Sequence, residues 1–213
     1  MSTPKRYLLL ILAVMIQSAG IALVVKSLLG TSPISSLPYV LSLISPFTFG
    51  QTTFAVNMVF VVFELLMLRR DFPAVFWLQI PVTILFGFCI DFFMNLFTIV
   101  PDAYALKLLL CLLGTALVAL GVAGQGIADV LMLAGEGAVY TFAHQFHIDF
   151  GKVKVGNDIS LVILAAIVSV LTMGTIEGIR EGTLISALLT GIIARFYLRH
   201  LLRLRRRAVR RAG

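Results

Sequence analysis

Long apolar stretches constrain this chain more than any other feature of its sequence. A helix needs about 20 mainly apolar residues to cross a bilayer, and six stretches approach that length: 7–29, 51–68, 74–99, 106–133, 157–175 and 183–203. Of the 213 residues, 60% are hydrophobic and 13% are charged. A chain of this size has too little interior to bury that excess, so lipid must solvate much of it. The composition excludes a soluble enzyme, a disordered tail, a disulfide scaffold and a nucleic-acid-binding domain.

Two shorter apolar segments follow the first and the fourth long stretch. Residues 33–49 come after the turn Gly30-Thr31-Ser32-Pro33, and residues 136–148 begin at Gly135-Glu136-Gly137. Each segment is too short to cross the membrane and return, and each begins at residues that favour a turn. We therefore expect half-helices that either enter the bilayer and return or lie along its surface.

The order of long, short, long and long segments occurs twice along the chain, which suggests an internal duplication. Ala19-Gly20 aligns with Ala123-Gly124, and Asn57 aligns with Asp158. Three crossings in each repeat would invert one repeat relative to the other. The sequence thus predicts an all-α polytopic membrane protein with two inverted three-helix repeats, 1–101 and 102–202, and a basic tail, 203–213.

Positive charge predicts the orientation of these helices, because Lys and Arg concentrate on the cytoplasmic side. With six crossings and a cytoplasmic N-terminus, the three residues on the outer side are Lys26, Lys107 and Arg180. The other Lys and Arg, including eight Arg from Arg195 to Arg211, then lie inside. If both short segments crossed, Arg69 and Arg70 would move outside, which is less favourable. We expect both termini in the cytoplasm, with anchors to anionic headgroups at Arg69, Arg70, Arg205, Arg206 and Arg207.

Several motifs together resemble the YczE/YyaS/YitT family of bacterial integral membrane proteins. In the second half they are Gly135-Glu136-Gly137, Phe150-Gly151-Lys152-Val153-Lys154, Asp158 and Arg180-Glu181-Gly182-Thr183. In the first half they are Leu29-Gly30-Thr31-Ser32-Pro33 and Leu78-Gln79-Ile80-Pro81 followed by Gly87 and Asp91. The resemblance covers nearly the whole chain before the basic tail. It implies a multi-helix protein of the bacterial inner membrane, and it implies no known reaction.

Acidic residues inside apolar stretches are candidate site residues, since an ionisable group in hydrocarbon usually faces the bundle interior or a wet cavity. Glu136 either caps a half-helix or binds a cation or proton in a cavity. Asp129 would share a face with Glu136 if one helix ran through both. Asp91 is either a structural partner of a backbone group or Asn95, or a site residue. Glu64 is interpreted as a carboxylate that reaches toward the inner interface.

Helix-start chemistry explains a second group of candidates. Asp158 either caps the fifth long helix or pairs with Lys154, four residues earlier. Ser32 and Pro33 suit the start of the first half-helix, whose free N–H groups could hold an anion. Three residues before the last long helix are interpreted first as a helix start and second as a gate or ligand contact: Arg180, Glu181 and Thr183.

Other residues carry no catalytic or metal-binding pattern. Cys89 and Cys111 lie in apolar stretches and are interpreted as packed thiols. His144 and His147 are spaced as metal ligands can be, with Asp149 nearby, but a firm third ligand is missing. We therefore expect no metal site. The sequence contains no nucleophile-elbow, zinc-protease or phosphate-loop motif. We therefore expect neither an enzyme nor a cofactor.

These observations together favour a small-solute or ion carrier with a polar site at the repeat interface. Its site would use Glu136, Asp129, Asp158, Ser32 and Asp91. The alternative is a non-transporting membrane scaffold or regulatory partner of another protein, suggested by the Arg-rich tail. The bilayer is the expected partner, a homo-oligomer is a further option, and nucleic acid is excluded.

Overall fold

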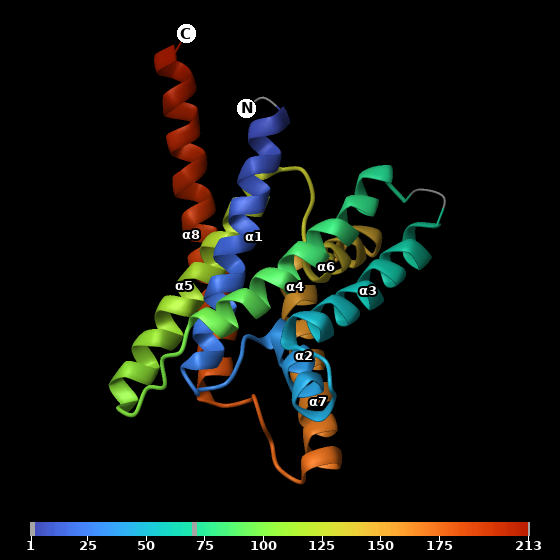
Figure 1. Cartoon of the computed structure of the whole chain (residues 1–213). Coiled ribbons are helices and arrows are strands. Elements are labelled where there is room, and N and C mark those ends of the chain that lie inside the picture. Colours follow the sequence, from blue (N-terminus) through green and yellow to red (C-terminus); the bar gives the residue numbers. More distant parts are fainter. Residues whose placement is uncertain (1–2, 70–71, 213) are drawn as a thin grey trace.

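The computed structural model describes residues 3–69 and 72–212, with side chains as far as residue 200 (Figure 1). These residues form helices and connecting loops and contain no β-strand, which confirms the all-α prediction. The helices are α1 (Thr3–Lys26), α2 (Pro33–Ile44), α3 (Phe49–Leu68), a 3-10 helix η2 (Ala74–Leu78), α4 (Gln79–Leu96), α5 (Tyr104–Ala128), α6 (Ala134–Gln145), α7 (Phe150–Met173) and α8 (Glu181–Ala212).

Six of the helical segments within the described residues are long and apolar enough to span a membrane, as predicted. They are α1, α3, η2 with α4, α5, α7 and the Glu181–His200 part of α8. The remaining helices, α2 and α6, have 12 residues each. Twelve residues of α-helix reach about 18 Å, well short of the roughly 30 Å of a hydrocarbon core. The predicted order of long and short elements is therefore present twice.

The first and fifth helices, α1 and α5, run antiparallel and form the most extensive helix pair (Figure 1). Small residues let their backbones approach closely. A Cβ added to Gly114 would lie 2.7 Å from the Gly20 carbonyl oxygen, and one added to Gly124 would lie 2.8 Å from the Ala13 Cβ. Glycines of α5 therefore allow the close approach of this pair.

The other helices pack in corresponding pairs around α1 and α5. Helix α4 packs on α1, and α8 packs on α5. Helix α3 packs on α6, and α2 packs on α7. Each half-helix also packs on the long helix that follows it in sequence, α2 on α3 and α6 on α7.

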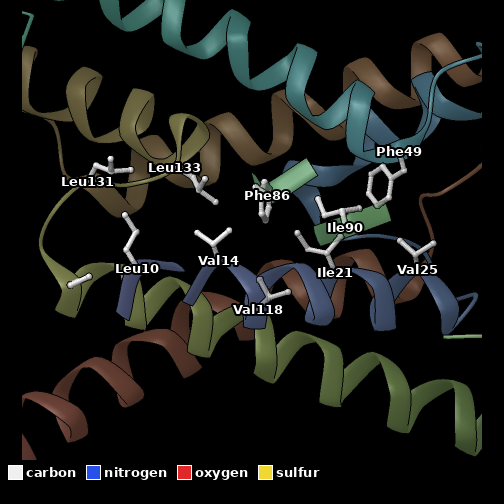
Figure 2. Packing of buried hydrophobic residues seen from close by; sticks show 11 residues of the cluster. Leu10, Val14, Ile21, Val25, Phe49, Phe86, Ile90, Val118, Leu131 and Leu133 are labelled. Carbon is white, nitrogen blue, oxygen red and sulfur yellow. The ribbon is translucent and has the colours of Figure 1, made fainter. Parts of the chain in front are cut away.

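The buried apolar core lies along the inner face of α1. Figure 2 shows Val14, Ile21 and Val25 of α1 directed toward side chains from α3, α4 and the segment before α6. Phe86 and Ile90 come from α4, and both are at most 4% exposed. Leu133, which immediately precedes α6, joins the same cluster. The start of a half-helix is thus part of the core.

Several predicted helix boundaries differ from the structure. The first short segment was expected to reach residue 49, but α2 ends at Ile44, and the last helix was expected to end at residue 203, but α8 continues to Ala212. At two further boundaries a local backbone feature explains the difference. The fourth long helix was expected to reach residue 133, but α5 ends at Ala128 because Asp129 adopts a left-handed conformation with φ 50°. The fifth was expected to begin at residue 157, but α7 begins at Phe150. The Asp149 carboxylate caps it there by accepting a hydrogen bond from the Lys152 N–H at 3.2 Å.

Contacts between helix ends place each end of α1 against the second half of the chain. At the start of α1, the Arg6 Nε donates to the Ala128 carbonyl at the end of α5, at 2.8 Å. At its other end, the Leu29 carbonyl accepts from the Gly182 N–H at the start of α8, at 2.8 Å. As a result, the first described residues of α1 and the last turns of α8 lie at the same end of the molecule (Figure 1).

Candidate functional site

The N-terminal ends of the two half-helices meet inside the bundle. A Cβ added to Gly135, in the first turn of α6, would lie 2.6 Å from the Ile34 Cδ1 in the first turn of α2. The first turns of both helices are mostly buried, whereas Leu43 and Ile44 at the end of α2 and Phe146 after α6 are exposed. Each half-helix therefore reaches from the surface into the interior, with its positive dipole end innermost.

A small enclosed cavity lies between these two helix starts. Its walls come from five helices and from the residue before α6, and they are Gln17, Ile34, Ser35, Thr53, Asn57, Phe86, Leu133 and Glu136. The free space is enough for about one water molecule. Polar side chains from both halves of the chain thus face one buried point.

Side chains of neighbouring helices hold the start of α6 at this cavity. The Asn57 Oδ1 of α3 accepts from the Gly135 N–H at 3.3 Å, and the Gln125 Oε1 of α5 accepts from the Leu133 N–H at 3.2 Å. The Gln125 amide also donates to the Gln17 Oε1. The first N–H groups of a helix have no partner within that helix. Here amide side chains of α3 and α5 supply two of these partners.

Glu136 is the acidic residue of the cavity wall. It lies in the first turn of α6 and is 8% exposed. Burial raises the pKa of the Glu136 carboxyl above its ordinary value, the nearby Lys154 lowers it, and Asp158 raises it further. Lys154 itself forms an ion pair with Asp158 at 2.8 Å. Glu136 forms no ion pair with a described residue, so the Lys154–Asp158 pair acts on it only through charge.

Asp129 and Asp158 differ in their relation to this cavity. The Asp129 side chain is 81% exposed and binds Arg6 at 2.7 Å. One continuous helix would have placed it on the same face as Glu136, but α5 ends before it at Ala128. Asp158 does not start a helix, since α7 begins at Phe150. Its predicted pairing with Lys154 is confirmed, and this pair lies close enough to act on Glu136.

Ser32 and Asp91 both lie at helix starts, Ser32 before its own helix and Asp91 against the start of another. Ser32 occupies the N-cap position of α2 with Pro33 after it, as predicted, but its hydroxyl donates to the Ser35 Oγ at 2.9 Å and makes no bond to the described backbone of that helix. The Asp91 carboxylate accepts from the Gly50 N–H at 2.7 Å and from the Thr48 hydroxyl at 2.6 Å. The backbone partner expected for Asp91 is therefore present, and Asp91 holds the start of α3.

The predicted gate residues join two loops at the opposite end of the bundle from Arg6. The Thr183 Oγ1 accepts from the Thr31 N–H at 3.2 Å and from the Arg180 N–H at 3.3 Å. Glu181 is the first residue of α8, and its carboxylate lies 4.0 Å from the Arg180 Nε. The helix-start interpretation therefore holds, and Thr183 adds a contact to the loop before α2.

The remaining candidates contribute little to the cavity. Arg69 is exposed at the end of α3, while Arg70 and the side chains of Arg205, Arg206 and Arg207 lie outside the described residues. His144 stacks on Tyr140. Within the described chain, no group of three metal-binding side chains is found. Cys89 and Cys111 are free and buried, as expected of packed thiols.

One comparison with known proteins decides the family. The model of a family of unknown function, DUF6198, matches residues 4–199. The chain belongs to the DUF6198 family. Neither a curated protein nor a solved structure matches it. The matched region contains nearly all of the described helices and leaves out the last turns of α8. The cavity therefore lies within the residues that this DUF6198 protein shares with its family model.

Sequence reasoning missed several polar residues of this DUF6198 chain. Gln17, Asn57 and Gln125 hold or line the cavity, and the available signal was an amide side chain in the middle of an apolar stretch. Glu64 was expected to reach toward the interface, but it is 0% exposed. That prediction is wrong, because α6 packs against α3 and its Gly137 lies directly over the Glu64 carboxyl.

Proposed function

We propose that this protein is a membrane carrier for a small polar solute or ion, and not an enzyme. The observation that carries the proposal is the buried polar cavity at which the starts of α2 and α6 meet, with Glu136 in its wall. Helix starts buried in a membrane protein offer free N–H groups and positive dipole ends to a ligand. A carboxyl at the same point adds a group that binds a cation or a proton.

The packing pairs support two inverted repeats, 1–101 and 102–202, as the basis of this carrier. The contact of α4 with α1 corresponds to that of α8 with α5, and the contact of α3 with α6 corresponds to that of α7 with α2. In this arrangement the cavity lies where the two repeats meet. Rocking of one repeat against the other would then open the cavity to either side.

The cavity in this structure has room for about one water molecule, which is the size expected of a closed state. A solute would enter only after the half-helices separate. The resemblance to YczE/YyaS/YitT proteins, the six candidate spans and the Lys and Arg distribution all favour the bacterial inner membrane, with both termini in the cytoplasm.

A thermal-shift screen of the purified protein tests the site. Three proteins would be compared: wild type, Glu136→Gln and the control Glu177→Gln. Each would be screened with small organic anions and with inorganic and organic cations, over a range of pH. Glu177 is an exposed acid outside the cavity, so its substitution removes the same charge elsewhere. We expect at least one compound to stabilise wild type and Glu177→Gln but not Glu136→Gln. Flux of that compound into proteoliposomes should be lost in the same variant.

Normal binding and flux in Glu136→Gln would remove Glu136 from the site. A ligand that stabilises all three proteins equally would place the binding site elsewhere.

A second function, a non-transporting scaffold or regulatory partner, is favoured by the length of α8. This helix has 32 residues, about 48 Å, and continues beyond the span that ends at His200. Its last turns could dock another protein at the membrane surface. Silence across the whole ligand screen, in lipid as well as in detergent, would favour this second function.

A further inference from the structure

Glu64 of α3 is a second buried acid, and the cavity at Glu136 does not include it. The two sites lie along the same face of α3, because Glu64 follows the cavity residue Asn57 by seven residues, or about two helical turns. Asn57 binds the start of α6 at Gly135, and Glu64 lies against Gly137 in the same turn. One short segment of α6 therefore touches both sites.

Gly137 is what allows α6 to lie over Glu64. A Cβ at this position would overlap the Glu64 Oε1 and would lie 2.9 Å from the Gln79 Nε2, at the start of α4. Three helices, α3, α4 and α6, therefore enclose the carboxyl group. Thr83 lies one turn after Gln79 on the same face of α4 and is also fully buried.

Four oxygen atoms of this group make no hydrogen bond, although the Gln79 amide nitrogen lies beside the Glu64 carboxyl and the Thr83 hydroxyl can donate. Both carboxyl oxygens of Glu64, the Gln79 Oε1 and the Thr83 Oγ1 are buried, and none has a hydrogen-bond partner among the described residues. Buried polar atoms are nearly always paired. Four unpaired oxygens from two helices can accept more hydrogen bonds than the Thr83 hydroxyl and the Gln79 amide supply, so the group has room for a further donor.

The charged groups on the elements around Glu64 lie elsewhere. Helix α3 packs against α2, α4 and α6. The titratable residues of those helices are Tyr39, Cys89, Asp91, Glu136, Tyr140 and His144, of which Tyr140 is 52% exposed. Tyr39 contacts Phe49 and Asp91 binds Gly50, both at the far end of α3, and Glu136 faces the cavity. Cys89 lies ten residues beyond Gln79, and His144 stacks on Tyr140. Arg69, at the end of α3, is exposed.

An ionised Glu64 would therefore be a buried negative charge, and it forms no ion pair with any described residue. Such a charge is very unfavourable in an apolar interior, and a carboxyl in this situation is neutralised instead. Glu136 differs, because Lys154 lies near it. A proton needs no cavity to bind. Once Glu64 is protonated, its carboxyl O–H could donate a hydrogen bond to the Gln79 Oε1 or the Thr83 Oγ1.

We propose that Glu64 is the proton-binding site of this protein, occupied when α6 is packed over it through Gly137. The proton binds one carboxylate oxygen to give the neutral acid, and it leaves to water when α6 moves away from α3. This proposal rests on the carrier function, to which it adds the coupling ion. Movement of α6 would expose the Glu136 cavity and the Glu64 carboxyl together, which links solute release to proton release.

Infrared spectroscopy of the full chain in lipid tests this assignment without any transport assay. A protonated carboxylic acid has a C=O stretching band separate from those of carboxylates and amides. We expect wild type to show such a band at neutral pH. The intensity of the band should not change with bulk pH as long as α6 stays packed on α3. Glu64→Gln should lose the band, whereas the control Glu177→Gln should keep it. An unchanged band in Glu64→Gln would overturn the proposal.

Gly137→Ala provides a second variant in which Glu64 itself is retained. Its added methyl group should separate α6 from α3, expose the carboxyl to water and shift the loss of the band to a lower pH than in wild type. Thermal unfolding in Na⁺, with choline as the control cation, tests the alternative of a metal cation. If Na⁺ stabilises wild type but not Glu64→Gln, Glu64 binds a metal cation and the proton assignment fails.

The two proposals can fail separately. Loss of the band in Glu64→Gln, with normal solute binding in Glu136→Gln, would retain the proton site and reject the cavity. The opposite pair of results would retain the cavity and reject the proton site.

Discussion

Four glycines stand where the backbones of α1 and α5 come closest. They are Gly20, Gly114, Gly121 and Gly124, and a Cβ added to any of them would lie less than 3 Å from an atom of the facing helix. At Gly114 the nearby atoms include the Gly20 carbonyl oxygen and the Val24 backbone nitrogen. Backbone atoms cannot rotate away as a side chain can, so these positions determine the separation of the two central helices.

Gly114→Ala should therefore destabilise the protein, by about 1–3 kcal/mol if the strain resembles other overpacked interiors. The matched control is Gly191→Ala in α8, where an added Cβ meets nothing within 4 Å. In that exposed helix position alanine should be neutral or stabilising by about 0.5–1 kcal/mol. Thermal unfolding of both variants in the same detergent measures the difference. Equal midpoints would contradict the close packing of α1 on α5.

Individual acids could be predicted only in part from the sequence. The pairing of Asp158 with Lys154 follows from a spacing of four residues, and it is confirmed. The positions of Asp129 and Glu64 could not be derived in this way. Asp129 depends on a left-handed residue that ends α5, and Glu64 depends on which distant helix covers it. Both are decided by contacts between residues far apart in the chain, which helical periodicity does not contain.

The Thr183 hydroxyl is one of several groups that join the loop before α2 to the loop before α8. The Thr183 Oγ1 accepts from the Thr31 and Arg180 N–H groups, and Thr183 is 1% exposed. The Thr31 hydroxyl in turn donates to the Gly178 carbonyl at 3.1 Å. A buried N–H group that loses its acceptor is costly, so Thr183 holds together the end of the bundle at which α2 enters.

Thr183→Val keeps the shape of this side chain but removes the oxygen. We expect it to lower the free energy of unfolding by about 1–3 kcal/mol, because two backbone N–H groups lose their acceptor. Thr183→Ser keeps the oxygen and should cost less. The comparison is made by thermal unfolding in detergent. Should valine be tolerated as well as serine, the hydroxyl would not join the loops. Should valine also speed solute flux, the contact would act as a gate.

Element type was easier to predict than element position. All six long helices and both short ones were expected, because a run of apolar residues long enough to span leaves few other structures in lipid. Their ends were less predictable, as α7 shows: its start depends on the Asp149 cap, eight residues before the expected start at residue 157. The half-helix starts at Ser32 and Glu136 were expected to frame a polar site at the repeat interface. The side chains of other helices that line it, such as Gln17 and Asn57, depend on tertiary packing.

The arrangement of helix ends bears on how many times the whole chain crosses the membrane. The start of α1 lies against the end of α5, and the start of α8 lies against the end of α1. The start of α3 is bound to Asp91, near the end of α4. With 12 residues each, α2 and α6 are too short to add crossings as helices. These observations support six crossings with both termini on one side.

Cysteine labelling distinguishes six crossings from eight. Cys89 and Cys111 would first be replaced by alanine, and single cysteines would then be introduced at Lys5, Arg69 or Asp102. With six crossings, Arg69→Cys should react from the same side as Lys5→Cys, and Asp102→Cys from the opposite side. If α2 and α6 also crossed in extended form, Arg69 and Asp102 would exchange sides while Lys5 would not. A membrane-impermeant thiol reagent, applied to intact cells and to inverted vesicles, gives the answer. Six crossings are also what the proposed inverted repeats require, because two consecutive repeats of three helices lie inverted in the membrane whereas two consecutive repeats of four do not.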